Sequence, residues 1–137
     1  MENVFDYKHY FSLGYEYKDR VGVCHHSKNG VRALSHVEVE VDVERALPYM
    51  LNKWGPVTVA VDFSKQHWYK GGVIEASECT GDPHHAVLLV GYTPEYWIVK
   101  NSMGTKWGDE GYAYIARDQN ACGLNTYASV ATGVITT

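Results

Sequence analysis

The chain has 137 residues, with a hydrophobic fraction of 45% and an aromatic fraction of 13%; these values predict one folded domain with a single core and exclude a disordered tail. Its formal net charge of −4 is mixed along the chain without a Lys/Arg cluster, so we expect no nucleic-acid partner and no membrane partner. No apolar run approaches the ~20 residues that span a bilayer, and the opening MENVFD does not resemble a signal peptide.

Residues 1–36 are rich in Tyr, His and Gly and show little periodicity. We expect mostly loop here, with the end of a helix over 4–10. Residues 37–43 alternate strictly between valine and an acidic residue, which predicts a strand with one apolar face. We therefore divide the chain into a mostly loop segment over 1–36 and a domain over 37–137.

A helix is predicted from Val43 to Trp54, with Asp42 as its N-cap. Pro48 lies inside it and should kink the helix or delay its start, while Gly55 and the proline after it should end it. The apolar spacing predicts an inner face made of Ala46, Leu47, Met50, Leu51 and Trp54.

The second half of the chain reads as strands separated by turns and long loops. Apolar, β-branched stretches predict strands over 57–61, 85–92, 96–101 and 111–117, a last short strand near 129–132, and a loop over 63–74. Several antiparallel strands with one helix and long loops are typical of an all-β or α+β barrel-like domain.

The three cysteines, Cys24, Cys79 and Cys122, are an odd number. In an oxidising compartment they predict one disulfide and one unpaired cysteine. In a reducing compartment they would be three buried thiols. Composition leaves both readings open.

One pair of residues carries the strongest chemical signal. His85 stands in the sequence PHHAV, and Asn101 stands in VKNSMG. An imidazole that activates a thiol needs a fixed tautomer and ring orientation, which a third group supplies by hydrogen-bonding the far ring nitrogen. An amide oxygen suits a cysteine–histidine pair, so we interpret these residues as two thirds of a catalytic triad.

Three linked blocks extend this signal: HAVLLVGY from His85, YWIVKNS from Tyr96 and GTKWGDEGY from Gly104. In order and spacing they resemble the papain family of cysteine proteases, and the resemblance extends over 37–132 and more weakly from Phe5. It implies an α+β right-hand domain with an antiparallel, β-barrel-like sheet, one or two short helices and long loops. It also implies a cysteine-type peptidase in which His85 is the general base and Asn101 orients it.

The resemblance assigns the cysteines as well. It implies a disulfide between Cys79 and Cys122, worth roughly 4 kcal/mol on the chain-entropy estimate. Cys24 resembles the cysteine that bonds to the family's left-hand domain, so it is expected to be unpaired here and not a nucleophile. The family implies a lysosomal or extracellular location.

Further site residues follow from the same resemblance. Met103 stands where the family usually has Trp, and with Trp107 it is expected to shield the His85–Asn101 hydrogen bond, although more weakly than a Trp at position 103 would because Met is smaller and more mobile. Tyr127 is expected to lie at the floor of the main specificity pocket and to fill or narrow it. The expected pocket residues are Ala60, Pro83, Ala86 and Tyr127.

The family's Cys-Gly-Ser-Cys-Trp nucleophile segment and its oxyanion glutamine have no counterpart in this sequence. We therefore expect no activity from this chain by itself. One hypothesis is the His/Asn-bearing half of a peptidase, with a left-hand domain or partner chain that supplies the cysteine and a protein or peptide as substrate. The alternative is an inactive papain-like domain that binds another protein.

We expect no metal and no cofactor. The chain has seven histidines, including two adjacent pairs, but neighbouring residues on a strand point to opposite faces. No His-x-x-x-His or Cys-x-x-Cys spacing occurs. Gly71 and Gly72 are read as a turn, because no helix and no Lys/Ser follow them as in a phosphate-binding loop.

Overall fold

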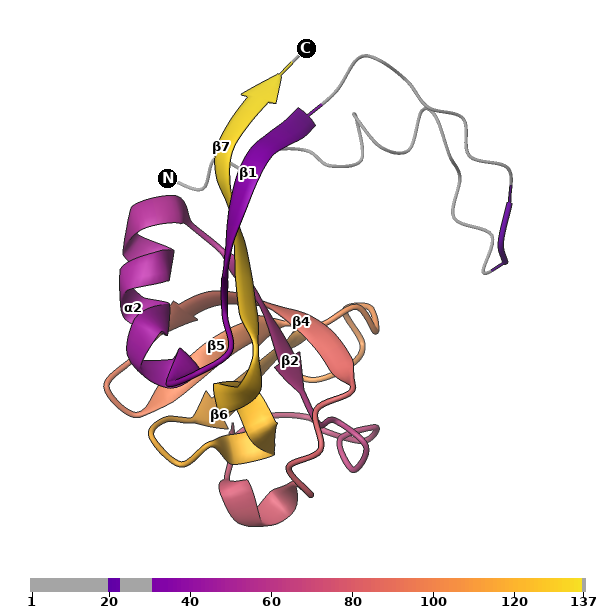
Figure 1. Ribbon diagram of the computed structural model, residues 1–137. Helices are drawn as coiled ribbons and strands as arrows, with labels where there is room; N and C mark the ends of the chain where they lie inside the picture. Colours follow the sequence, from indigo (N-terminus) through magenta and orange to yellow (C-terminus); the bar gives the residue numbers. More distant parts are fainter. Residues whose placement is uncertain (1–19, 23–30, 137) are drawn as a thin grey trace.

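The computed structural model describes residues 20–22 and 31–136. They form an α+β unit that consists mostly of sheet (Figure 1). In chain order the elements are β1 (Val31–Val39), α2 (Val43–Trp54), β2 (Val57–Val61), β3 (Val73–Ile74), the 3₁₀ helix η1 (Ala76–Glu78), β4 (His85–Tyr92), β5 (Tyr96–Lys100), β6 (Tyr112–Ala116), the 3₁₀ helix η2 (Ala121–Thr126) and β7 (Ala128–Thr136).

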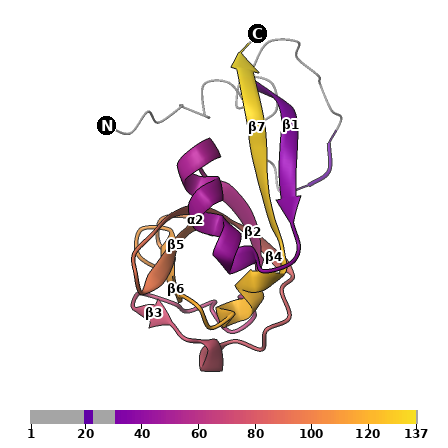
Figure 2. The same cartoon turned by 60° about the vertical axis from the view of Figure 1, so that its left-hand side comes forward.

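The seven strands form one curved sheet in the order β1-β7-β2-β4-β5-β6-β3 (Figure 2). All neighbours are antiparallel except β3, which pairs with β6 in parallel. Since β1 and β3 are edges, the sheet resembles a barrel that does not close. The α+β prediction is confirmed, whereas β3 lies inside a stretch predicted as loop.

Along the strands of the sheet, side chains alternate between the face that lines the core and the face that points away from it. In β2, Val57, Val59 and Val61 are fully buried, while Thr58 and Ala60 are not. The same alternation in β4 buries Val87 and Leu89. Small residues between these positions therefore face away from the core, which matters for the site described below.

Helix α2 has the predicted bounds, and it begins at Val43, so Pro48 does not delay its start. Asp42 occupies the N-cap position as predicted, but it lies in the left-handed region at φ 49° and its side chain makes no capping hydrogen bond. Leu47 and Met50 are buried as predicted, while Ala46, Leu51 and Trp54 pack partly buried against the core.

A buried carboxylate fastens the start of α2 to the far end of the chain. The Glu44 side chain accepts hydrogen bonds from Trp97 Nε1 (3.3 Å) and from the backbone N–H groups of Asp118 (2.6 Å) and Asn120 (2.9 Å). Glu44 is 7% exposed. A polar group at this depth is tolerated because hydrogen-bond donors replace its water, and here they hold the turn before η2 against the helix.

Strands β1 and β7 form a ribbon that extends away from the body of the domain (Figure 1). β1 begins at Val31, so the expected loop is wrong for 31–36, and β1 ends at Val39 rather than at residue 43. β7 is likewise longer than predicted. Pairing between the two strands, which runs from Val31 opposite Thr136 to Val39 opposite Ala128, accounts for both extensions. The expected division between residues 36 and 37 falls within β1.

The predicted disulfide is confirmed: Cys79 and Cys122 are bonded, with a Cα–Cα distance of 4.9 Å and a sequence separation of 43. The bond joins the segment after η1 to η2. Because the loop it closes is long, it restricts the unfolded chain substantially.

Replacing both bonded cysteines, in a Cys79→Ala/Cys122→Ala variant, should lower the free energy of unfolding by about 4 kcal/mol. Urea denaturation under non-reducing conditions measures the change. Cys24→Ala is the matched control and should leave the midpoint near that of the unmodified chain. Equal midpoints for the double variant and the control would contradict the prediction.

Candidate functional site

His85 and Asn101 are brought together by the ends of two neighbouring strands. His85 is the first residue of β4 and pairs with Val61 at the end of β2. Asn101 directly follows β5, which lies antiparallel to β4 with Lys100 opposite Leu88. The backbone N–H of Asn101 donates to the Gly111 carbonyl at 2.9 Å, which fixes the chain just beyond the strand.

The two side chains are hydrogen-bonded, with 2.8 Å between His85 Nε2 and Asn101 Oδ1. The backbone N–H of Ser102 also donates to Asn101 Oδ1, at 2.8 Å. A backbone N–H can only donate, so this atom must be the amide oxygen. His85 Nε2 therefore carries the proton, and Nδ1 keeps its lone pair.

The amide of Asn101 is only half satisfied. Asn101 is 8% exposed, and its Nδ2 atom is buried without an acceptor in the part of the chain that the structure describes. An unpaired buried donor costs about 1–3 kcal/mol, and such groups are rare in native proteins. This arrangement favours a residue retained for the orientation of its oxygen rather than for stability.

Aromatic rings cover one side of His85. The ring centre of Phe63 lies 6.0 Å from that of His85, and the ring centre of Trp107 lies 5.7 Å from that of Phe63. Trp107 is 6% exposed and donates from Nε1 to the Gln66 carbonyl at 2.9 Å. Met103 is 41% exposed. The shielding roles of Met103 and Trp107 stay predictions. The ring of Phe63 lies between Trp107 and His85, and the sequence did not point to Phe63 as a site residue.

Three of the four expected pocket residues lie side by side. Ala60 pairs with Ala86 across β2 and β4, and its N–H donates to the Tyr127 carbonyl at 3.3 Å on the other side. Pro83 packs beside Gly123, where an added Cβ would come within 2.9 Å of the proline Cδ. The pocket role of all four residues stays a prediction.

The Tyr127 side chain is hydrogen-bonded to an acidic residue of strand β1. Its hydroxyl donates to Glu38 Oε1 at 3.0 Å, and this bond raises the pKa of Tyr127 above its ordinary value.

A hollow of about 300 Å³ opens on the same face of the sheet, beside Asn101. It is lined by Thr58, Ala86, Val87, Leu88, Lys100, Asn101 and Ser102.

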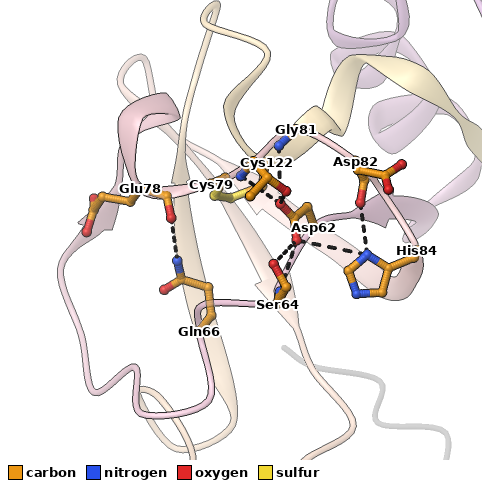
Figure 3. Close-up of polar contacts among 10 residues, drawn as sticks. Asp62, Ser64, Gln66, Glu78, Cys79, Gly81, Asp82, His84 and Cys122 are labelled. Carbon is orange, nitrogen blue, oxygen red and sulfur yellow. Dashed lines mark hydrogen bonds and ion pairs between the residues drawn. A yellow bond between two sulfur atoms is a disulfide. The ribbon is translucent and has the colours of Figure 1, made fainter.

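Asp62, which the sequence reasoning also missed, lies directly after β2 and is 1% exposed. Its carboxylate accepts hydrogen bonds from the backbone and hydroxyl of Ser64 (3.0 and 2.5 Å) and from the N–H of Gly81 at 3.1 Å (Figure 3). The backbone N–H of Thr80 (2.7 Å) and its hydroxyl also donate to this carboxylate. Burial alone would raise the pKa of Asp62, but the bonds from Ser64 and Thr80 outweigh it and hold the pKa well below its ordinary value.

Over residues 20–22 and 31–136, no group of three or more His, Cys, Asp or Glu side chains is placed to hold a metal ion. Cys24, the pair His25-His26 and Phe5 lie outside the described residues.

None of the helices among the described residues has the length and apolar character that a membrane crossing requires.

The sequence and the fold are similar to known proteases. A family model described as papain family cysteine protease matches residues 1–132. Cathepsin S of Mus musculus is 40% identical over 124 residues, covering 84% of this chain and 36% of the mouse protein. A cathepsin L-like protein of Caenorhabditis elegans is 41% identical over 126 residues, covering 84% of this chain and 37% of the nematode protein.

Among solved structures, the digestive procathepsin L2 proteinase from the larval midgut of Tenebrio molitor superimposes with a TM-score of 0.79 at 40% identity. The match covers 89% of this chain and 42% of the beetle protein. The chain thus spans little more than a third of the length of the two curated relatives above.

Asp62→Asn should lower the free energy of unfolding by about 2–4 kcal/mol near neutral pH, because an amide cannot accept all the bonds of the carboxylate. Since the folded-state pKa is depressed, the carboxylate's contribution is fully present above the ordinary aspartate value of about 4 and is lost as the pH falls through the folded-state pKa. The difference from the unmodified chain should therefore shrink below about pH 4. Urea denaturation across this range measures it.

Asp82→Asn is the matched control, because it removes the same charge from an exposed position nearby. It should leave stability nearly unchanged. A pH-independent difference for Asp62→Asn would contradict the account of the carboxylate.

Proposed function

This chain belongs to the papain family of cysteine proteases, and from that membership we propose that it is the His/Asn-bearing half of a cysteine-type peptidase. The observation that carries the proposal is the 2.8 Å hydrogen bond from His85 Nε2 to Asn101 Oδ1. It leaves Nδ1 as a base on a ring that cannot turn away without breaking the bond.

The proposed reaction is hydrolysis of a peptide bond through an acyl-enzyme. Nδ1 of His85 takes the proton of a cysteine thiol, and the thiolate attacks the carbonyl carbon of the substrate. The imidazolium then gives its Nδ1 proton to the departing amine, which leaves an acyl-enzyme. In the second half, Nδ1 takes a proton from water, the resulting hydroxide attacks the acyl carbon, and the thiolate departs. Asn101 accepts the Nε2 proton's hydrogen bond throughout.

The nucleophile is proposed to come from outside the described residues. Within 31–136 both cysteines are bonded to each other, so neither can be a nucleophile while the disulfide is intact. The expected source is a left-hand domain or partner chain, with Cys24 as the residue that bonds to it. The share of each relative that this chain covers is consistent with a further domain.

The substrate is proposed to be a protein or peptide that lies across the outward face of β2 and β4. Ala60 and Ala86 leave space there because their side chains are small, and the bond from Tyr127 to Glu38 keeps the phenol from swinging freely. A pocket closed in this way by Tyr127 favours a small or narrow substrate side chain, with Pro83 as a further wall.

The expected compartment is lysosomal or extracellular. Its support is the bond between Cys79 and Cys122, because disulfides persist mainly in oxidising compartments.

The second candidate is a catalytically inactive domain that binds another protein. It is favoured by the lack of a free thiol within residues 31–136 and by the exposure of Met103 beside Asn101. This candidate predicts a complex that forms without hydrolysis.

The proposal is tested by refolding the chain with the nucleophile-bearing half of the Tenebrio molitor relative and assaying a fluorogenic peptide. The chain alone should give no hydrolysis, and the reconstituted pair should be active. His85→Ala should reduce the rate by about 10²–10⁴, the usual contribution of a general acid–base group, and Asn101→Ala should reduce it less.

Glu95→Gln, at an exposed turn away from the site, is the matched control and should keep the rate of the reconstituted pair. Hydrolysis that persists at full rate in His85→Ala would contradict the proposal. A stable complex without hydrolysis would support the binding candidate instead.

A further inference from the structure

A short segment, residues 79–84, leads from the disulfide to His85 and contains no helix or strand. Its first residue is fixed to η2 through the bond between Cys79 and Cys122. Its last residue, His84, donates its backbone N–H to the Val61 carbonyl at 3.2 Å. The residues between these two points have no regular pairing, so other contacts must determine their path.

The carboxylate of Asp62 supplies those contacts (Figure 3). Its Oδ2 atom accepts hydrogen bonds from the backbone N–H and the hydroxyl of Thr80 and from the N–H of Gly81. The His84 ring also approaches it, with 3.9 Å between Nδ1 and Oδ1. One buried charge thus holds the segment near its start and faces its end.

Asp62 is itself held in place from two sides. Its backbone N–H donates to the Cys122 carbonyl at 2.7 Å, and its Oδ1 atom accepts from the backbone N–H and hydroxyl of Ser64. It also follows Val61, the residue that pairs with His85. Through its backbone and its carboxylate together, Asp62 therefore connects the end of β2, η2 and the segment before His85.

The two carboxylate oxygens of Asp62 accept hydrogen bonds from two different segments. Oδ1 bonds Ser64, which belongs to the turn after β2, while Oδ2 bonds Thr80 and Gly81, which belong to the segment leading to His85. A hydroxyl removed from the Oδ2 side should loosen that segment. Oδ1 also faces the His84 ring, but at 3.9 Å this approach is longer than a hydrogen bond, so a hydroxyl removed from the Oδ1 side should leave the bonds to Thr80 and Gly81 in place.

We propose that Asp62 is a positioning residue for His85, which it fixes by holding residues 80–84 against the end of β2. His85 is the first residue of its strand, so its backbone depends on the residues before it as well as on the sheet. Productive catalytic geometry has a tolerance of about 0.5 Å, which a loop without regular pairing would not maintain. The inference deepens the proposed peptidase function and rests on the role proposed there for His85.

The test compares two hydroxyls that bond the same carboxylate, in the full 137-residue chain. Thr80→Val removes the hydroxyl on the Oδ2 side without changing the side chain's shape, and Ser64→Ala removes the one on the Oδ1 side. NMR measures the rate at which the His85 Nε2 proton exchanges with water, which reports how often the bond to Asn101 opens. Thr80→Val should raise that rate about tenfold, the effect of losing one charge-assisted bond.

Ser64→Ala and the conservative variant Thr80→Ser, which restores the hydroxyl, should stay within about twofold of the unmodified chain. Equal exchange rates in Thr80→Val and Ser64→Ala would overturn the inference, since a merely structural carboxylate would respond to both losses alike. Thr80→Ala serves as the second variant if the valine disturbs folding. The readout does not need the nucleophile, so failure of the reconstituted peptidase would leave this result interpretable on its own.

Discussion

The side-chain oxygen of Asn101 accepts two hydrogen bonds, and the chemistry of the site depends on both. The bond from the Ser102 N–H fixes which end of the amide is oxygen, and the bond from His85 Nε2 then fixes the tautomer of the imidazole. Together they leave Nδ1 as the only base on the ring. The pairing of β4 with β5 produces this geometry, because His85 lies at the start of β4 and Asn101 directly follows β5. Asn101 Nδ2, which has no acceptor among residues 20–22 and 31–136, is consistent with a residue kept for its oxygen.

Buried carboxylates stabilise two irregular segments of the domain. Glu44 holds the turn before η2 and Asp62 holds the segment before His85, and each is satisfied largely by backbone N–H groups rather than by a cationic partner. Such donors are part of the chain and lose little additional entropy when they bond, whereas an ion pair must order two long side chains. The disulfide between Cys79 and Cys122 acts on the same region by limiting the unfolded chain.

Much of the fold could be predicted because its signals are local. Helix α2, β2 and β4 have the predicted bounds, since apolar spacing and the turn residues after them are visible in the sequence. Pairing partners are not visible in this way. β1 and β7 extend beyond the bounds predicted from their apolar residues because each strand stabilises the other by pairing with it. The two-residue strand β3 forms only because β6 lies beside it.

In the candidate site, too, the residues with local sequence signals could be predicted and those that depend on long-range contacts could not. The motif blocks pointed to His85 and Asn101, which are hydrogen-bonded to each other, and the family resemblance pointed to the disulfide between Cys79 and Cys122. Asp62 and Phe63 were missed, although an aspartate at the end of an apolar strand followed two residues later by Ser64 is a turn signal. What makes Asp62 important is its bonding to Thr80 and Gly81, which are separated from it in the sequence by a loop, β3 and η1.

The role proposed for His85 requires that this chain alone hold the ring with a free lone pair at Nδ1. Long-range ¹H–¹⁵N NMR of the 137-residue chain, with His85 assigned by comparison with His85→Gln, tests it most directly. The account predicts a protonated, pyrrole-type shift for Nε2 and an unprotonated, pyridine-type shift for Nδ1 in the neutral ring, and loss of that preference in Asn101→Ala. A neutral ring protonated at Nδ1, or a tautomer mixture unchanged by Asn101→Ala, would contradict it.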